Sequence, residues 1–368
     1  MSSIFFNFAE KFATVFASSP PTSNNSSNVI LSESTNILIT GGCGFIGTNM
    51  IIHLLKKYPR YRIYNIDKLD YCSVSSDLIK HVNYKFIKCN IVTDVDIMKK
   101  ILYDHQINVI LHFAAQSHVD NSFGNSFSFT ENNVLGTHKL IECCREYHQK
   151  TQSIQKFIHI STDEVYGEIS NATSTTHFQP TNPYAASKAS AEHVVFSYYK
   201  SYNIPIIITR SNNIYGPYQY PEKVIPKWIN LLEQNKKCPI HGNGTHRRCY
   251  IYVDDIVEAY DIIMHKGEVG EVYNIPSEYE FSNLDLIMTL SVMYDKKKFY
   301  EFVSDRAFND CRYHIIDEDK KLEKLGWIQK VNIFDGLKQT IEWYKNNKID
   351  NVWEKGTSEK ALVSHPVL

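Results

Sequence analysis

Between residues 36 and 210, short apolar runs alternate with stretches whose apolar residues have helical spacing. The run NILIT at 36–40 precedes helical spacing over 48–58, and further apolar runs lie at 62–67, 84–91, 109–115, 156–162 and 204–210. Near-continuous apolar strands that alternate with helices are typical of a parallel sheet covered on both faces. The sequence therefore predicts an α/β fold built on a doubly wound parallel sheet of the Rossmann type.

After Arg210 the alternation becomes irregular, and Asn, Tyr, Gly and Pro are frequent over 211–226. We expect this change to mark a smaller, mixed α/β domain that closes over the sheet. The aromatic start of the chain and the Ser/Asn/Pro-rich linker after it predict an N-terminal extension, and periodicity is lost near the C-terminus. The expected division is an extension at 1–35, a dinucleotide-binding domain at 36–212 plus about 250–275, a second domain at 213–249 plus about 276–345, and a loose tail at 346–368.

The overall composition excludes several classes of partner. Lys plus Arg total 39 and Asp plus Glu total 40, without a basic block, which argues against nucleic acid as the main partner. Apolar runs are too short to cross a membrane, and Glu10 and Lys11 interrupt the N-terminal stretch, unlike a signal peptide. The eight cysteines lack the spacing of metal ligands, so we expect no metal site, reduced thiols and a cytoplasmic protein.

A glycine-rich turn, TGGCGFIG, joins the first apolar run to the first helical stretch and contains Gly41, Gly44 and Gly47. Such glycines allow a tight turn, a close approach to a pyrophosphate and close packing of helix on strand. Asp67 follows Gly47 by 20 residues at the end of the next run, where an acid accepts hydrogen bonds from ribose and disfavours a 2′-phosphate. The pattern favours NAD over NADP, although Asp67 as a helix N-cap is the alternative.

Two neighbouring acids, Asp163 and Glu164, follow the run 156–162 in the segment HISTDEVYG. A proton donor and a proton acceptor side by side need environments that push their pKa values apart. The alternative is that one of these carboxyl groups caps a following turn.

Tyr184 and Lys188 are four residues apart in NPYAASK, and therefore lie on one face of a helix. A nearby ammonium group lowers the pKa of a tyrosine and makes it a usable base for an alcohol. An ordinary pair on a helix surface is the alternative.

Together, the glycine turn, the Ser161-Thr162 pair and the Tyr184/Lys188 pair resemble the extended short-chain dehydrogenase/reductase family over nearly all of 36–345. The segments STDEVYG, PTNPYAASKA, YPEKVIP and DRAFNDCRY are similar to those of nucleotide-sugar 4,6-dehydratases. The segments AAQSHVDNSFGNSF, FNDCRY and PIHGNG resemble those of the UDP-glucose branch of this family, which includes the dehydratase domain of plant rhamnose synthases.

This resemblance implies conversion of UDP-glucose to UDP-4-keto-6-deoxyglucose, towards rhamnose or another deoxysugar, by a homodimer with tightly bound NAD. Tyr184, helped by Thr162, takes the proton of the 4-hydroxyl while hydride passes from C4 to NAD. Glu164 then removes the C5 proton, Asp163 protonates the departing 6-hydroxyl, and the hydride returns to C6. Helices expected near 132–149 and 186–200 are candidates for the dimer interface.

The resemblance also implies a set of binding residues. For the cofactor these are Gly41, Gly44, Phe45, Ile46, Gly47, Asp67, Lys68, Asn90, Ile91, Ala114, Ala115, Gln116, Tyr184 and Lys188. For the nucleotide sugar they are Ser117, Thr162, Asn213, Glu222, Lys223, Arg248, Asn283, Asn309 and Arg312. A guanidinium group pairs two phosphate oxygens at once, which favours the two arginines as diphosphate ligands. Each is otherwise a surface charge or the partner of an ion pair.

The sequence departs from bacterial relatives at Cys249-Tyr250, at Ala307–Asn309 and at Asn90, so the preferred nucleobase stays open. Alternatives are a dTDP-glucose 4,6-dehydratase, a UDP-sugar 4-epimerase, a sugar-acid decarboxylase and a non-catalytic NAD-binding protein. The acid pair argues against the epimerase and the decarboxylase, which do not expel water. Retention of the acids with the Tyr184/Lys188 pair argues against the non-catalytic protein.

Overall fold

The computed structural model describes residues 31, 32, 34–305, 310–354, 356, 357 and 361. Most of the expected N-terminal extension lies outside these residues, as does Asn309. Of the extension, Leu31 is buried in the core beside the sheet.

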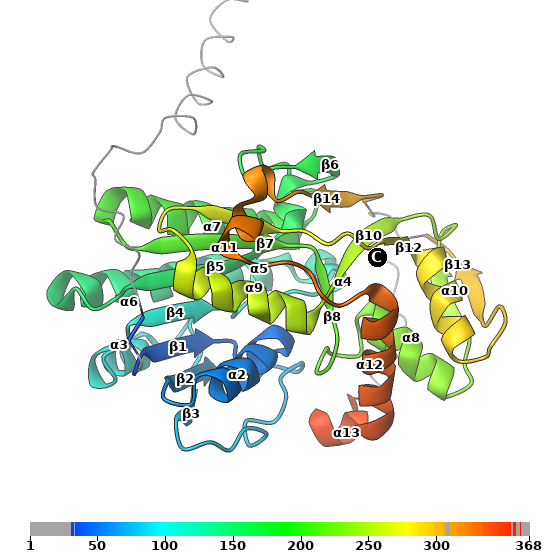
Figure 1. Ribbon diagram of the computed structural model, residues 1–368, viewed down its shortest axis with the longest axis horizontal. Coiled ribbons are helices and arrows are strands. Elements are labelled where there is room, and N and C mark those ends of the chain that lie inside the picture. Colours follow the sequence, from blue (N-terminus) through cyan, green and yellow to red (C-terminus); the bar gives the residue numbers. More distant parts are fainter. Residues whose placement is uncertain (1–30, 33, 306–309, 355, 358–360, 362–368) are drawn as a thin grey trace, which may run out of the picture.

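A seven-stranded sheet forms the centre of the molecule, with strand order β11-β7-β5-β4-β1-β2-β3 and every neighbouring pair parallel (Figure 1). Its strands are β1 (Asn36–Thr40), β2 (Arg62–Asp67), β3 (Tyr84–Lys88), β4 (Val109–His112), β5 (Lys156–Thr162), β7 (Ile206–Ser211) and β11 (Val272–Ile275). The predicted doubly wound parallel sheet is confirmed.

Two strands are shorter than the apolar runs that predicted them. β3 ends at Lys88 and β4 at His112, before the ends of the runs 84–91 and 109–115. The residues that follow, including Asn90, Ile91 and Ala114, leave the sheet and line a cavity at its edge.

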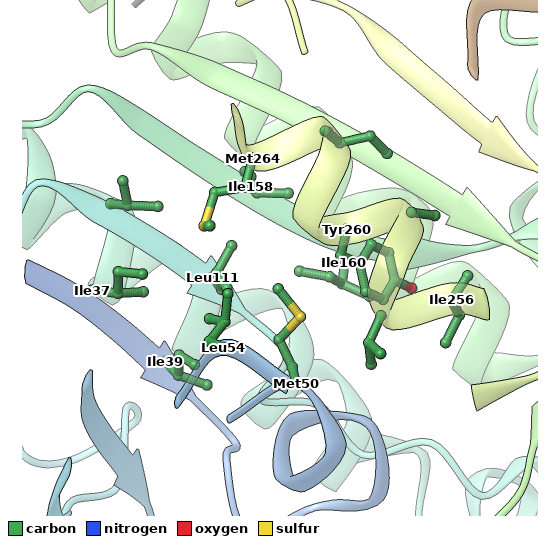
Figure 2. Packing of buried hydrophobic residues seen from close by; sticks show 14 of the residues in the cluster. Ile37, Ile39, Met50, Leu54, Leu111, Ile158, Ile160, Ile256, Tyr260 and Met264 are labelled. Atoms are coloured by element: carbon green, nitrogen blue, oxygen red, sulfur yellow. The ribbon is translucent and has the colours of Figure 1, made fainter. Parts of the chain in front are cut away.

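Helices cover both faces of the sheet because side chains alternate along each strand. Ile37 and Ile39 of β1 pack in one core with α2 (Phe45–Lys57) and α9 (Val253–Lys266), as Figure 2 shows. Leu38, between them, points into a second core with α3 (Val95–Asp104), α6 (Gly136–Thr151) and α7 (Pro183–Tyr202). The sheet is thus buried on both sides, which holds its carboxyl-terminal edge rigidly.

A separate hydrophobic core lies beside that edge and belongs to the second lobe of the molecule (Figure 1). Its elements are α8 (Val224–Glu233), β9 (Cys238–His241), β10 (Arg247–Tyr252), β12 (Glu280–Ser282), α10 (Asn283–Met293), β13 (Tyr300–Val303), α12 (Ile333–Asn346) and α13 (Ile349–Val352). β10 pairs with β8 (Asn213–Tyr215) and β12, and β9 pairs with β13. All these elements follow β7 in the chain, whereas α9 and β11, which also follow it, belong to the sheet lobe. The second lobe lies at the carboxyl-terminal end of the sheet strands (Figure 1).

Shorter elements complete the fold. They are α4 (Val119–Gly124), α5 (Ser126–Phe129), the π-helix η1 (Thr130–Leu135), the 3₁₀ turns η2 (Asp163–Tyr166) and η3 (Glu318–Lys320), α11 (Lys321–Leu325), and the paired strands β6 (Ile169–Ala172) and β14 (Tyr313–Ile315). Within the part of the chain that the structure describes, every helix is too short or too polar to span a bilayer.

The expectation of a loose tail is wrong for residues 349–353. Ile349, Val352 and Trp353 are buried in the core of the second lobe. The Trp353 ring packs edge-on against Tyr220, with ring centroids 5.7 Å apart. These three side chains are spaced i, i+3, i+4, which is helical spacing over a single turn, and they anchor the segment.

Candidate active site

The cavity at the carboxyl-terminal edge of the sheet lies where the strand order reverses. From β1 the chain builds outward through β2 and β3, then returns to β4 on the other side of β1. The crevice at such a switch point is where open α/β sheets bind ligands. The cavity is lined by all the residues expected to bind the cofactor, and by Ser117, Glu222 and Lys223 of the expected substrate set.

The glycine turn is packed too tightly against the backbone to accept side chains at Gly41 and Gly47. A Cβ atom on Gly41, whose φ is +69°, would lie 2.7 Å from the Cα atom of Ala114 at the end of β4. A Cβ atom on Gly47 would lie 2.4 Å from the Gly41 carbonyl oxygen. At Gly44 it would meet that oxygen at 3.2 Å and otherwise project without a heavy-atom contact within 4 Å. The turn is therefore closed towards the protein and open towards the cavity, which fits a pyrophosphate.

Asp67 lies at the end of β2 with its carboxylate against the turn. Its Oδ2 accepts a hydrogen bond from the Cys43 amide at 3.0 Å, and its Oδ1 accepts one from the Leu69 amide at 2.8 Å. No helix follows Asp67 in the described range 68–94, so the N-cap alternative does not apply. The buried acid faces the cavity at the position that favours ribose hydroxyls over a phosphate, and these residues fit NAD.

The acid pair follows β5 and lies in η2. The N-cap of this turn is Thr162, whose hydroxyl accepts a hydrogen bond from the Glu164 amide at 3.3 Å, so neither carboxyl group is used for capping. Asp163 is 2% exposed, and its Oδ1 lies 3.2 Å from the Thr162 hydroxyl, which donates to it. Both carboxyl groups are thus available for chemistry.

Burial raises the pKa of both acids. The pKa of Asp163 rises to about 6 because burial outweighs the hydrogen bond from Asn212 and the charge of Arg248. The pKa of Glu164 rises to about 7 because burial and the neighbouring Asp163 charge both disfavour its ionised form. Both pKa values are thus raised towards neutral pH, and they lie close together, whereas the sequence analysis expected the two environments to push them apart.

Tyr184 and Lys188 lie on α7 beside the end of β5, and both line the cavity. The Lys188 ammonium group donates to the carbonyl oxygen of Ile160 at 2.7 Å, and burial lowers its pKa to about 8. The pKa of Tyr184 is raised, not lowered as expected, because of burial and the negative charge of Glu164, although a hydrogen bond with Thr162 lowers it. In this structure Lys188 is engaged with the strand and the phenol is held neutral.

The expected substrate residues fall into two groups. Glu222 and Lys223 reach across the cavity from the second lobe: the Tyr71 hydroxyl donates to Glu222 at 3.0 Å, and the Lys223 ammonium group donates to the Ser117 carbonyl oxygen at 2.7 Å. Because Tyr71 and Ser117 belong to the sheet lobe, these contacts join the two lobes over the cavity.

The second group surrounds β10. Asn213 lies on β8 opposite Tyr250, and the Asn283 amide, at the start of α10, donates to the His246 carbonyl oxygen. The Arg248 guanidinium group lies 4.5 Å from the centre of the Tyr313 ring, and its charge lowers the pKa of both acids. Arg312 forms an ion pair with Glu280, which matches the alternative role of that arginine as an ion-pair partner.

Two asparagines in contact with the acid pair were not expected from the sequence. Asn212 donates to Asp163 at 2.7 Å, and Asn182 donates to Glu164 at 3.1 Å. Asn212 stands beside Asn213 in the segment SNN, but adjacent positions on a strand point to opposite faces, so the motif alone did not distinguish them.

The π-helix η1 also contributes to the site unexpectedly. Asn133 exchanges hydrogen bonds with the backbone of Gln116, at 2.7 and 3.0 Å, and Asn132 accepts one from Lys68 at 3.0 Å. π-helical turns occur often at functional sites because they reorient side chains. The segment 132–149 was expected to be a regular helix, and its periodicity does not show the wider turn.

Groups of three or more His, Cys, Asp or Glu residues placed to hold a metal ion do not occur among the described residues. All eight cysteines are free thiols, and Cys311 is exposed.

A parallel sheet with a glycine turn at its switch point, and a Tyr-Lys pair beside two acids, define an NAD-binding enzyme of the extended short-chain dehydrogenase/reductase class. The model of the GDP-mannose 4,6 dehydratase family matches residues 38–340. The chain belongs to this family, and it is an NAD-dependent sugar-nucleotide dehydratase, a hydro-lyase.

Relatives of this chain carry two different nucleotides in their names. It is 45% identical to a dTDP-D-glucose 4,6-dehydratase of Dictyostelium discoideum, over 90% of this chain and 85% of that one. It is 46% identical to a trifunctional UDP-glucose 4,6-dehydratase/UDP-4-keto-6-deoxy-D-glucose 3,5-epimerase/UDP-4-keto-L-rhamnose-reductase of Arabidopsis thaliana, over 90% of this chain and only 50% of that one.

Among solved structures, the chain is similar to the dTDP-glucose 4,6-dehydratase DesIV of Streptomyces venezuelae, crystallised with NAD bound. The TM-score is 0.81 and the identity 33%, over 87% of this chain and 99% of that one.

Proposed function

We propose that the protein is a UDP-glucose 4,6-dehydratase that forms UDP-4-keto-6-deoxyglucose. The observation that carries the proposal is the acid pair. Asp163 is buried beside Thr162, and the charges of Asp163 and Glu164 are close enough to raise the pKa of Tyr184, which lines the cofactor cavity. A dehydratase needs a base for C5 and an acid for the 6-hydroxyl, whereas an epimerase needs neither. The acids are therefore the feature that separates this function from the epimerase and the decarboxylase on the same fold.

NAD, when bound, would supply the acceptor for the C4 hydride, the donor of that hydride to C6, and a positive charge. The residues of the glycine turn and Asp67 would hold its pyrophosphate and ribose, respectively. Tyr184 takes the proton of the 4-hydroxyl, and Thr162 hydrogen-bonds to the phenol. Because burial and Glu164 raise the pKa of Tyr184, this transfer needs added positive charge beside the phenol.

In the elimination, Glu164 takes the proton from C5 and Asp163 gives a proton to the 6-hydroxyl. The C6–O bond then breaks and water leaves, after which the proton on Glu164 returns to C5 as the hydride reaches C6. The raised pKa of Asp163 makes its protonated form more populated near neutral pH than that of an ordinary aspartate. The charge of Arg248 lowers the pKa of both acids, and its guanidinium group is the candidate ligand for the diphosphate of the substrate.

The choice of UDP rests on the sequences of the segments AAQSHVDNSFGNSF, FNDCRY and PIHGNG, and on the similarity to the Arabidopsis protein. A dTDP-glucose 4,6-dehydratase is the second candidate, because the Dictyostelium protein is similar at nearly the same identity. We further propose a homodimer in the cytoplasm, with rhamnose or another deoxysugar as the destination of the product.

The test is to incubate purified protein with UDP-glucose, and separately with dTDP-glucose, without added cofactor. Loss of one water from UDP-glucose, measured by mass spectrometry, supports the proposal, and the alkaline absorbance of a 4-keto-6-deoxy sugar checks the product. Loss of water from dTDP-glucose alone would overturn the nucleotide and keep the reaction. Intact substrate in both incubations, despite NAD released from the denatured protein, would overturn the dehydratase function.

A further inference from the structure

We infer that Asn212 is a positioning residue, which fixes the Asp163 carboxyl group so that Oδ1, the oxygen beside Thr162, is the one that carries the acid's proton. The inference rests on the proposed function, because it assigns Asp163 the role of proton donor to the leaving group. Asn212 and Asp163 are each 2% exposed, so their contact is shielded from water.

The orientation of the Asn212 amide is determined by its second partner. Its side-chain oxygen accepts a hydrogen bond from the Ser277 backbone amide at 2.9 Å, and a backbone amide can only donate. The Asn212 NH₂ group must therefore face Asp163, where it donates to Oδ2 at 2.7 Å. Ser277 is itself fixed, since its hydroxyl donates to the Tyr250 carbonyl oxygen at 2.5 Å.

An NH₂ group facing Oδ2 keeps the acid's proton off that oxygen. Two hydrogens pointing at one another would repel, so a protonated Asp163 carries its proton on Oδ1. Oδ1 lies 3.2 Å from the Thr162 hydroxyl, which donates to it while the acid is ionised and can rotate to accept from it when the acid is protonated. The same hydroxyl hydrogen-bonds to Tyr184. The proton of Asp163 therefore lies on the side that faces Thr162 and Tyr184, the base of the first step.

The proton balance of the reaction explains why the proton of Asp163 should lie on Oδ1, beside Thr162. Tyr184 gains a proton from the 4-hydroxyl and does not return it to the sugar, whereas Asp163 loses a proton to the departing water. Glu164 takes one proton from C5 and gives one back. Each turnover must therefore remove one proton from Tyr184 and return one to Asp163. The Thr162 hydroxyl offers a direct path between the two when Oδ1 is the acceptor.

Glu164 has a similar arrangement with a different anchor. Asn182 donates to Glu164 at 3.1 Å, and its oxygen accepts from the Ala185 amide as the N-cap of α7. Replacing Asn182 would disturb both the acid and the helix. Asn212 is not a helix cap, and for that reason its replacement gives the clearer result.

The test is the isosteric substitution Asn212→Asp, with Asn212→Ser as a second variant in case the first does not fold. A carboxylate oxygen in place of the NH₂ group would draw the shared proton to Oδ2 of Asp163. We expect kcat to fall about 100-fold with little change in KM, the size of effect that general acid catalysis supplies. We also expect reduced nicotinamide to accumulate on mixing with substrate, seen by its absorbance, because oxidation at C4 proceeds while loss of water is slowed. Asn212→Ser removes the NH₂ group that donates to Oδ2 of Asp163, and its side chain is shorter. It should therefore lower kcat and cause reduced nicotinamide to accumulate as well.

The matched control is Asn274→Asp on the neighbouring strand β11. Asn274 is also buried and hydrogen-bonded, through the Tyr166 hydroxyl and the carbonyl oxygen of Ala172, but it does not contact the acid pair. It should lower stability without the accumulation of reduced nicotinamide. The inference is overturned if Asn212→Asp matches the wild type, or if it slows turnover without that accumulation, as a purely structural residue would. Failure of the wild type to release water would instead overturn the proposed function.

Discussion

At the scale of single residues, folding and catalysis make opposite demands on the acid pair. Asp163 is buried and the neighbouring Glu164 is half-buried, and their removal from water raises the pKa of both. Ionising them is therefore less favourable in the folded protein than in the unfolded chain, which lowers stability. Such a cost persists at functional sites because the chemistry requires it.

We predict that Glu164→Gln stabilises the protein while abolishing most of its activity. The pKa of Glu164 is raised from 4.5 to about 7, so the folded form binds this proton more tightly than the unfolded form. The wild type therefore loses stability as the pH rises between these two values, and the substitution removes that loss. We expect a gain of about 1–3 kcal/mol at about pH 8, which vanishes below about pH 5, from urea unfolding.

The same variant should lower kcat about 10²- to 10⁴-fold, because the base for C5 is lost. Glu301→Gln, at an exposed position on β13, serves as the control and should change neither quantity. A Glu164→Gln protein that is less stable than the wild type at alkaline pH would contradict the destabilising effect that we assign to burial of the Glu164 charge.

At the scale of elements, the turn between β1 and α2 separates packing from cofactor binding. A Cβ atom on Gly47 would lie 2.4 Å from the Gly41 carbonyl oxygen, whereas on Gly44 the same distance is 3.2 Å and the atom faces the cavity. We predict that Gly47→Ala lowers both the melting temperature and the NAD content of the purified protein. Gly44→Ala should lower mainly the NAD content, measured on the supernatant after denaturation. Equal effects of the two substitutions would contradict this division.

The packing of α2 against α9 depends on a buried carboxylate, Asp261, which is 1% exposed. It accepts hydrogen bonds from Lys57 at 2.6 Å and from His53 at 2.9 Å, and pairs with His265 at 2.9 Å. Although burial raises the pKa of Asp261, the hydrogen bonds from His265, His53 and Lys57 hold it well below its usual range.

We predict that Asp261→Asn destabilises the protein by about 1–3 kcal/mol at neutral pH, since it removes the buried carboxylate that accepts hydrogen bonds from Lys57 and His53. Urea unfolding measures the change, and Asp104→Asn, at an exposed position at the end of α3, is the control. Because α2 begins at the glycine turn, NAD content should fall together with stability. An unchanged unfolding midpoint would show that this cluster does not hold the two helices together.

At the scale of the whole molecule, the sequence predicted best those features that depend on local chemistry. The strands, the glycine turn and Asp67 were found because their residue types and spacing are set by neighbours in the chain. The partners of the acids were missed, because Asn212 contacts Asp163 across 49 positions and adjoining strands. Arg312 was expected to bind the substrate, but its ion pair with Glu280 depends on how two distant segments meet. Burial of Trp353 depends on contacts with Tyr220 that periodicity does not encode.

The two lobes meet over the cavity, and the acid pair lies close to Tyr184, which lines it. Lys223 of the second lobe contacts Ser117 of the sheet lobe, while the acid pair lies at the end of β5. A site closed in this way can retain NAD through the whole reaction, so the hydride removed from C4 should return to the same sugar. The central proposal is therefore that the hydride moves from C4 to C6 of one and the same sugar molecule.

The most direct test uses nucleotide-linked glucose with deuterium at C4, incubated with the protein as purified. The proposed mechanism predicts a product that has lost one water and carries the deuterium at C6, located by mass spectrometry of the released sugar and by NMR. In a mixture with unlabelled substrate, the label should stay within its original molecule. Deuterium that remains at C4 in a sugar without loss of water, or that is found at C4 of the epimer, would contradict the proposed mechanism.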